Sequence, residues 1–136
     1  MSENLWPDDL SSELDPDSPL VILQEQAEAL ALRTHGLLQA EVVLITPNDI
    51  LSFNFVLVAP ALDDYRYRLF KVWPDNKLDP YPVTLDVSSA DQRKAATAAE
   101  FREELRRIFF SNATRRAISE LLGYTTAVLS DPQRAA

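Results

Sequence analysis

Hydrophobic residues recur along this chain with two different periods, and the change from one period to the other separates its elements. From residue 19 to residue 34 they return every three or four positions, which is the spacing of one helical face. The residues of this face are Leu20, Leu23, Ala27, Leu30, Ala31 and Thr34. Ser18 can cap the helix, and Pro19 suits its first position because an N–H there would be unpaired. Gly36 predicts the helix end, since glycine readily takes the left-handed conformation.

Four apolar runs with a period of two follow, and they predict β-strands at 40–46, 51–59, 65–73 and 81–87. In the third strand the alternation places four residues on one face: Tyr65, Tyr67, Leu69 and Trp73. The connections between the runs are short, whereas parallel pairing needs a long crossover. The runs therefore predict an antiparallel meander, with the fourth strand at an edge because it contains Pro82.

Helical spacing returns after the strands and predicts two more helices. Ser88 or Ser89 can cap the first, which is expected to end near Phe110, and Ser111 or Asn112 can cap the second. The second of the two glycines, Gly123, is expected to end the last helix. The apolar residues of the two helices are Phe101, Leu105, Ile108, Phe109, Ala117, Ile118, Leu121 and Leu122.

These elements predict an α+β fold in the order α-β-β-β-β-α-α, a single domain in which the helices pack on one face of a four-stranded antiparallel meander sheet. The domain is expected to span residues 18–123. Residues 1–17 form an acidic segment that is expected to be disordered, and residues 124–136 are expected to form a loosely ordered tail.

The composition narrows the class of protein. The chain has 136 residues, of which 46% are hydrophobic and 25% are charged, so it has the size and composition of one globular domain. It contains no cysteine, which excludes disulfides, thiolate metal ligands and a cysteine nucleophile. No basic stretch followed by an apolar run opens the chain, and no apolar stretch approaches the length of a membrane span. We therefore expect a cytoplasmic protein.

Most of the net charge of −8 comes from the first 17 residues, which contain six acidic side chains and no basic one. The rest of the chain holds 15 acidic and 13 basic residues and is therefore close to neutral. Large apolar residues interrupt the acidic segment: Leu5, Trp6, Leu10 and Leu14. The segment is either a docking motif or a frayed terminus whose tryptophan packs on the domain.

Residue types that carry enzyme chemistry are scarce. Phosphate-binding loops need several glycines, and this chain has two, both at predicted helix ends. The one histidine, His35, lies in the last turn of the first helix, where the helix dipole explains it. Asp75, Asn76 and Asp79 lie close together but lack the glycine that a calcium loop requires. The sequence therefore predicts no catalytic residue, no metal site and no cofactor.

One arrangement of acidic residues suggests an enzyme. Asp49 precedes the second predicted strand, and Asp64-Tyr65-Arg66 opens the third. A helix followed by three strands with such acids resembles the core of the PD-(D/E)xK nucleases, in which carboxylates hold a metal ion and a lysine steadies the nucleophile. Here Arg66 stands at the lysine position, and the motif lies at a turn rather than within a strand. The resemblance implies a degenerate metal-dependent nuclease, which we keep as an alternative.

Residues 93–116 contain seven basic and three acidic side chains, an arrangement that could bind phosphates. The basic face that we expect on the helices consists of Arg102, Arg106, Arg107, Arg115 and Arg116. Three interpretations follow, in order of preference: a solvated helix surface, a binding surface for the acidic N-terminal segment, and a nucleic-acid binder.

The sheet face away from the helices provides the leading hypothesis. The strand alternation gives that face a polar half and an apolar half, and the apolar half is too extensive to be left in water. Either the C-terminal tail or a helix covers it, or a partner does. The predicted partner-binding residues on it are Asn54, Val56, Val58, Arg66, Arg68 and Phe70. We therefore predict a non-catalytic protein-interaction module, of an accessory, chaperone-like or inhibitor kind, that binds a protein partner or a second copy of itself.

Overall fold

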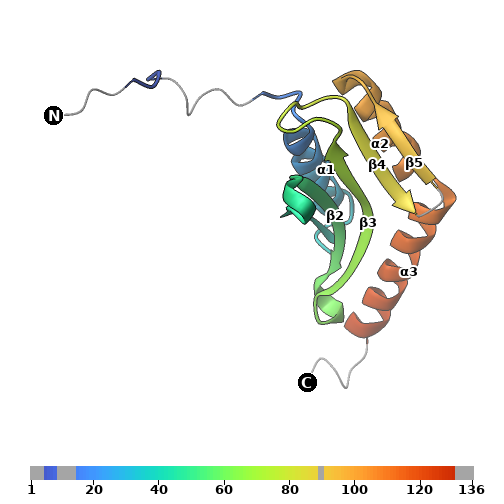
Figure 1. Cartoon of the computed structure of the whole chain (residues 1–136). Coiled ribbons are helices and arrows are strands. Elements are labelled where there is room, and N and C mark those ends of the chain that lie inside the picture. Colours follow the sequence, from blue (N-terminus) through green and yellow to red (C-terminus); the bar gives the residue numbers. More distant parts are fainter. Residues whose placement is uncertain (1–4, 9–14, 89–90, 131–136) are drawn as a thin grey trace.

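A computed structural model describes residues 5–8, 15–88 and 91–130 and confirms the α+β class (Figure 1). The described residues form three α-helices, five β-strands and two short 3₁₀ helices. In chain order they are α1 (Pro19–Arg33), β1 (Gln39–Ile45), η2 (Pro47–Asp49), β2 (Ser52–Ala59), η3 (Pro60–Leu62), β3 (Tyr65–Pro74), β4 (Val83–Ser88), β5 (Asp91–Ala95), α2 (Ala98–Phe109) and α3 (Asn112–Leu129).

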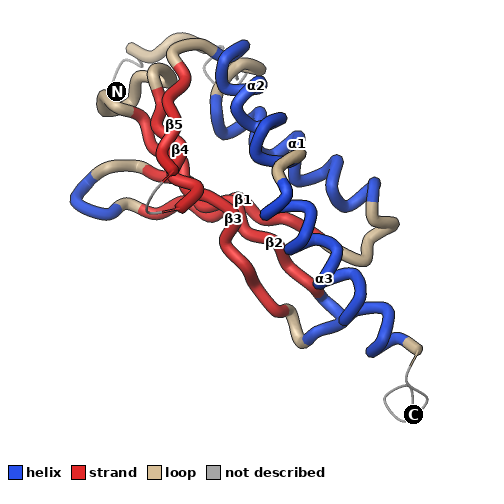
Figure 2. Tube along the Cα trace, turned by 90° about the vertical axis from the view of Figure 1, so that its right-hand side faces the viewer, coloured by secondary structure: helices blue, strands red, loops and turns tan. Residues whose placement is uncertain are grey.

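The five strands form one antiparallel sheet in the order β1-β2-β3-β4-β5, which is the predicted meander with one strand added. Figure 2 shows the three helices on the same side of this sheet, as predicted. We call the other side of the sheet the open face. Among the described residues, none of the helices combines the length and apolar character that a membrane span requires.

The additional strand, β5, occupies residues that were predicted to be helical. Asp91–Ala95 pairs with β4, and α2 begins only at Ala98. The capping box explains this start: the Thr97 hydroxyl accepts from the Glu100 N–H at 3.2 Å, and the Glu100 carboxylate accepts from the Ala96 N–H at 3.0 Å. The prediction of a cap at Ser88 or Ser89 was wrong because a Thr-x-x-Glu motif lies further along; Ser89 itself lies outside the described residues.

The two glycines have different roles. Gly36 has a φ of +79°, and its N–H donates to the Ala31 carbonyl at 2.8 Å, so it ends α1 as predicted. Gly123 lies within α3, which continues to Leu129, so the predicted helix end at Gly123 was wrong. A glycine inside a helix costs about 1 kcal/mol relative to alanine. Burial of Leu121 helps to offset this cost, and residues 124–129 belong to the helix rather than to a loose tail.

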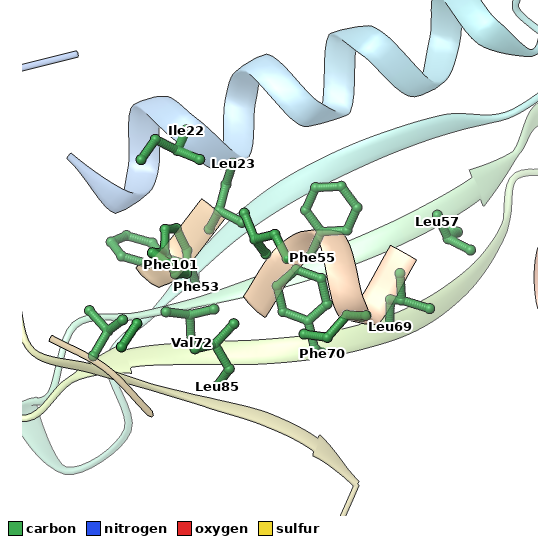
Figure 3. Packing of buried hydrophobic residues seen from close by; sticks show 14 of the residues in the cluster. Ile22, Leu23, Phe53, Phe55, Leu57, Leu69, Phe70, Val72, Leu85 and Phe101 are labelled. Carbon is green, nitrogen blue, oxygen red and sulfur yellow. The ribbon is translucent and has the colours of Figure 1, made fainter. Parts of the chain in front are cut away.

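The core lies between the helices and the sheet, and aromatic rings dominate its centre. Phe55 and Phe70 stack with their ring centroids 5.1 Å apart, and the Phe109 ring lies within 5.7 Å and 6.1 Å of them. Figure 3 shows Phe55 and Phe70 side by side beneath α1, with Leu57 and Leu69 farther along the same strands. The core therefore anchors the β2–β3 hairpin to all three helices.

A β-bulge in β3 decides which side chains reach this core. Phe55 pairs with Phe70, but the next residue of β2, Val56, pairs with Arg68, so Leu69 has no partner of its own. The extra residue reverses the alternation beyond it. Phe70 therefore faces the helices and Trp73 faces the other way, which is the reverse of the prediction from uninterrupted alternation.

Candidate functional site

The apolar half of the open face, which was predicted to bind a partner, is covered by the protein's own side chains. Val56 and Val58 do lie on this face, but they are only 7% and 4% exposed. Glu41 lies opposite Val56 on β1, Arg66 lies opposite Val58 on β3, and the two charged side chains join across β2 at 2.6 Å. Phe70 is fully buried on the opposite face because of the bulge. The apolar residues of β2 and β3 that motivated the prediction are therefore buried, while Val43 and Ile45 of β1 remain half-buried on this face.

The rest of the open face mixes polar residues with the half-buried Val43, Ile45 and Trp73. Asn54, Lys71 and Asp86 are neighbours in one row across β2, β3 and β4. The Lys71 ammonium lies 5.5 Å from the centre of the Trp73 ring on the same strand. Among the described residues, Oδ1 of Asn54 and Oδ1 of Asp86 are buried without a hydrogen-bond partner.

Acidic neighbours neutralise most of the predicted basic face. The Arg102 guanidinium lies 3.1 Å from the Asp17 carboxylate. Arg106 pairs with Glu103 at 2.8 Å, and Arg107 pairs with Glu104 at 3.2 Å, each one turn away on the same helix. The two remaining members of the face, Arg115 and Arg116, form no ion pair with the described residues. The structure therefore favours a solvated helix surface over a phosphate-binding surface.

The two acids of the nuclease-like arrangement lie at opposite ends of β2. Asp49 is in η2 before the strand, and Asp64 follows η3 after it. The eight residues of β2 separate them by roughly 26 Å at the usual rise of a strand. Both have positive φ, 63° and 57°, as turn residues often do. Carboxylates this far apart cannot share a metal ion, so the geometry contradicts the nuclease-like site.

The N-terminal segment contacts the domain through its last residues. The Tyr81 hydroxyl donates to the Asp17 carbonyl at 2.7 Å, while the Asp17 carboxylate binds Arg102. The pKa of Tyr81 is raised to about 12, chiefly by burial; the Arg102 guanidinium lowers it, and the carboxylates of Asp17 and Asp15 raise it. Of the four apolar residues in the predicted docking motif, Leu5 and Trp6 are 83% and 73% exposed. Leu10 and Leu14 lie outside the described residues.

The structure contains a surface that the sequence did not predict. Although β3 is the central strand of the sheet, part of it has no strand partner on one side. Only the last four residues of β3, Lys71–Pro74, pair with β4. The first six, 65–70, have β2 as their one strand neighbour in the described part of the chain. We call this stretch the free β3 edge. In Figure 1, β4 and β5 lie beside the upper part of β3, and α3 lies beside the lower part.

A groove of about 530 Å³ lies between the free β3 edge and α3, and we call it the β3–α3 groove. Aromatic and small side chains dominate its walls. Tyr65 and Tyr67 of β3 are 53% and 44% exposed, and Tyr124 of α3 is 60% exposed. The full lining is Leu62, Tyr65, Tyr67, Ala113, Arg116, Ala117, Glu120, Leu121 and Tyr124.

The tyrosines were expected to be core residues, and they do point toward the helix side of the sheet. Tyr67 lies opposite Leu57, and Tyr65 lies opposite Ala59, both of which belong to the core. They stay exposed because α3 covers the hairpin only in part. A second groove of about 440 Å³ lies on the other side of α3, where it meets α1 and α2, and includes the exposed ring of Phe110. The sequence contained one weak signal. Ala113 and Ala117 lie one turn apart on α3, and their small side chains leave room for the groove.

Comparisons with protein-family models, with curated proteins and with solved structures give no match, so the proposal below rests on the geometry of this chain.

Proposed function

We propose that the protein is a non-catalytic interaction module of the cytoplasm that binds a partner protein in the β3–α3 groove. The observation that carries the proposal is the coincidence of two features. A six-residue stretch of unpaired strand borders a groove of about 530 Å³ whose walls hold three exposed tyrosines. Unpaired strand edges and contiguous apolar surface are both features that proteins normally cover.

The composition of the groove suits binding. Tyrosine provides a large contact area at a low cost in conformational entropy, and its hydroxyl can form a hydrogen bond at the rim. Two charged residues line the groove, Arg116 and Glu120, one turn apart on α3, and the other seven lining residues are aromatic or apolar. Protein interfaces likewise combine an apolar core with polar residues.

Site-specific photocrosslinking in cells that produce this protein naturally tests the proposal. A photoreactive residue at Ala117 points into the groove, whereas one at Ser119 lies on the exposed opposite side of the same helix. We expect a protein adduct from position 117 and none from position 119, because only the first position contacts a partner held in the groove.

The mass of the adduct identifies the kind of partner. An adduct with a different protein supports the module as stated, and an adduct of two copies of this chain supports the homo-oligomeric form of the same proposal. Equal adduct yields from positions 117 and 119, or no adduct from either, would contradict it.

A further inference from the structure

We infer that the partner of the β3–α3 groove is an extended peptide segment in which acidic and apolar residues alternate, and that it joins the sheet as a strand along residues 65–70. The inference rests on the proposed function and names the partner's class. Three features of the described residues carry it: the backbone of the free β3 edge, the groove beside it, and the charges of the edge on the open face.

The backbone of the free edge provides the first feature. In a sheet, alternate residues of a strand direct their N–H and C=O groups toward one neighbour and the residues between them direct theirs toward the other. Of the six residues 65–70, all but Leu69 pair with β2, and about half of the six direct these groups to the side on which no described strand pairs with them. The edge is roughly 20 Å long, which suffices for an added strand of about six residues. Such a strand would occupy the place that β4 leaves after Asp86.

The groove provides the second feature, because it lies where the side chains of an added strand would point. Tyr65 and Tyr67 project from the edge toward the helices, and α3 presents Ala113 and Ala117 across from them. An added strand would place every second side chain on this same face of the sheet. Addition of a strand with pockets for alternate side chains is a recurrent mode of peptide recognition. The groove therefore selects apolar residues at every second position.

Charge provides the third feature. Arg66 and Arg68 lie on the free β3 edge, and their side chains are on the open face of the sheet. Arg66 is joined to Glu41, whereas Arg68 is exposed and forms no ion pair with the described residues. Directly opposed side chains on neighbouring strands stabilise a sheet when their charges are opposite and destabilise it when they are alike. Acidic residues at the intervening positions of the partner therefore complement this edge.

The same charges disfavour a second copy of the chain as the added strand. Two copies that paired antiparallel along this edge, with their helices on the same side, would set Arg66 and Arg68 against the same arginines of the other copy. The chain's own acidic segment also lacks the required pattern. It is interrupted by Pro7 and Pro16, and its longest alternation is Glu13-Leu14-Asp15.

A synthetic peptide tests the inference directly. The probe is a fluorescent ten-residue peptide of alternating glutamate and valine with blocked ends, and its binding to the full-length protein is followed by polarisation. Two further versions carry backbone N-methyl groups, one on every valine and the other on every glutamate. In a strand these two sets of amides point to opposite edges. We expect one methylated version to lose binding and the other to bind nearly as well as the parent.

A charge reversal provides the matched test of the partner's acidity. Arg68→Glu should weaken binding of the glutamate peptide by roughly fivefold and strengthen binding of a lysine–valine peptide by a similar factor. Arg115→Glu is the control, because Arg115 is exposed on α3 outside the groove lining, and it should change neither affinity. Circular dichroism of each variant confirms that the fold is retained.

The outcomes separate this inference from the proposed function. Equal binding of both methylated peptides, or equal loss, would show that the groove holds peptides without strand addition and would overturn the inference while the module stands. Absence of binding by all three peptides, together with an adduct at position 117, would overturn the partner's class alone. Absence of both binding and adduct would overturn the two together.

Discussion

The contacts of single residues show how the ends of the domain are held together. Tyr81, from the loop before β4, packs edge-on against Phe101 of α2 with the ring centroids 6.1 Å apart, and its hydroxyl reaches the backbone of Asp17 before α1. Arg102 binds the carboxylate of that same aspartate. Three segments that are far apart in the sequence thus meet around one phenol. This cluster ties the end of the N-terminal segment to the domain.

The raised pKa of Tyr81 makes the stability of the fold depend on pH in the alkaline range. The pKa is about 12 in the folded protein against a usual value of 10, chiefly because of burial. Between these values the folded chain retains a proton that the unfolded chain loses, so the free energy of unfolding falls as the pH rises. Tyr81→Phe removes this dependence. Its free energy of unfolding, measured by urea denaturation from pH 10 to pH 12, should therefore fall less steeply than that of the wild type.

Tyr124→Phe is the control, because Tyr124 is 60% exposed on α3 and should leave the pH dependence unchanged. Parallel pH profiles for the wild type and Tyr81→Phe would show that this phenol is not shielded in the folded protein.

At the scale of elements, the bulge in β3 is the feature that shapes the molecule most. It directs Phe70 into the core and leaves the tyrosines before it on the same side of the sheet. Without it, either the Tyr65–Tyr67 half or the Phe70–Val72 half of the strand would point away from the helices. One extra residue thus provides both a core anchor and a wall of the β3–α3 groove.

Substitutions on either side of the bulge test this assignment. Phe70→Ala should lower the free energy of unfolding by roughly 3–5 kcal/mol, because it removes a fully buried ring stacked on Phe55. Arg68→Ala should lower it by less than about 1 kcal/mol, since that side chain is exposed. Thermal and urea denaturation measure both. Similar losses for the two variants would place Phe70 on the surface and contradict the bulge.

The sequence predicted most elements because their signals are local. Alternation defined β1 to β4, and Pro19 and Gly36 defined the limits of α1, although the Ser18 side chain forms no capping hydrogen bond. The start of α2 at Thr97-x-x-Glu100 was a local signal too, but two other failures depended on contacts that no local pattern encodes. The bulge at Leu69 places Phe70 against Phe55 and Phe109, and the helix continues past Gly123 with Leu121 buried before it.

The candidate site was missed for a related reason. A strand is predicted from its own residues, whereas a free edge exists because a neighbouring strand is absent. The alternation of 65–70 predicted the tyrosines and arginines on opposite faces, as the structure has them. It could not show that β4 pairs with only Lys71–Pro74, because that depends on where β4 turns away to pair with β5.

At the scale of the whole molecule, the protein presents two unlike surfaces. On the open face, charged side chains of the protein itself cover apolar residues of β2. The Glu41–Arg66 pair lies across Val56 and Val58. The helix side is incomplete, because α3 leaves a groove on each side of itself over the β2–β3 hairpin. Binding is therefore expected at the helix side and along the free edge next to it.

Amide hydrogen exchange of residues 65–70, with and without the alternating glutamate–valine peptide, tests this account most directly. In the free protein the alternate amides of the edge that point away from β2 should exchange fast, since β4 does not cover them. The peptide should slow those amides, leave the amides already bonded to β2 unchanged, and have no effect at Val56 and Val58. Protection that appears on the open face, or an edge whose exchange is the same with and without bound peptide, would contradict the account.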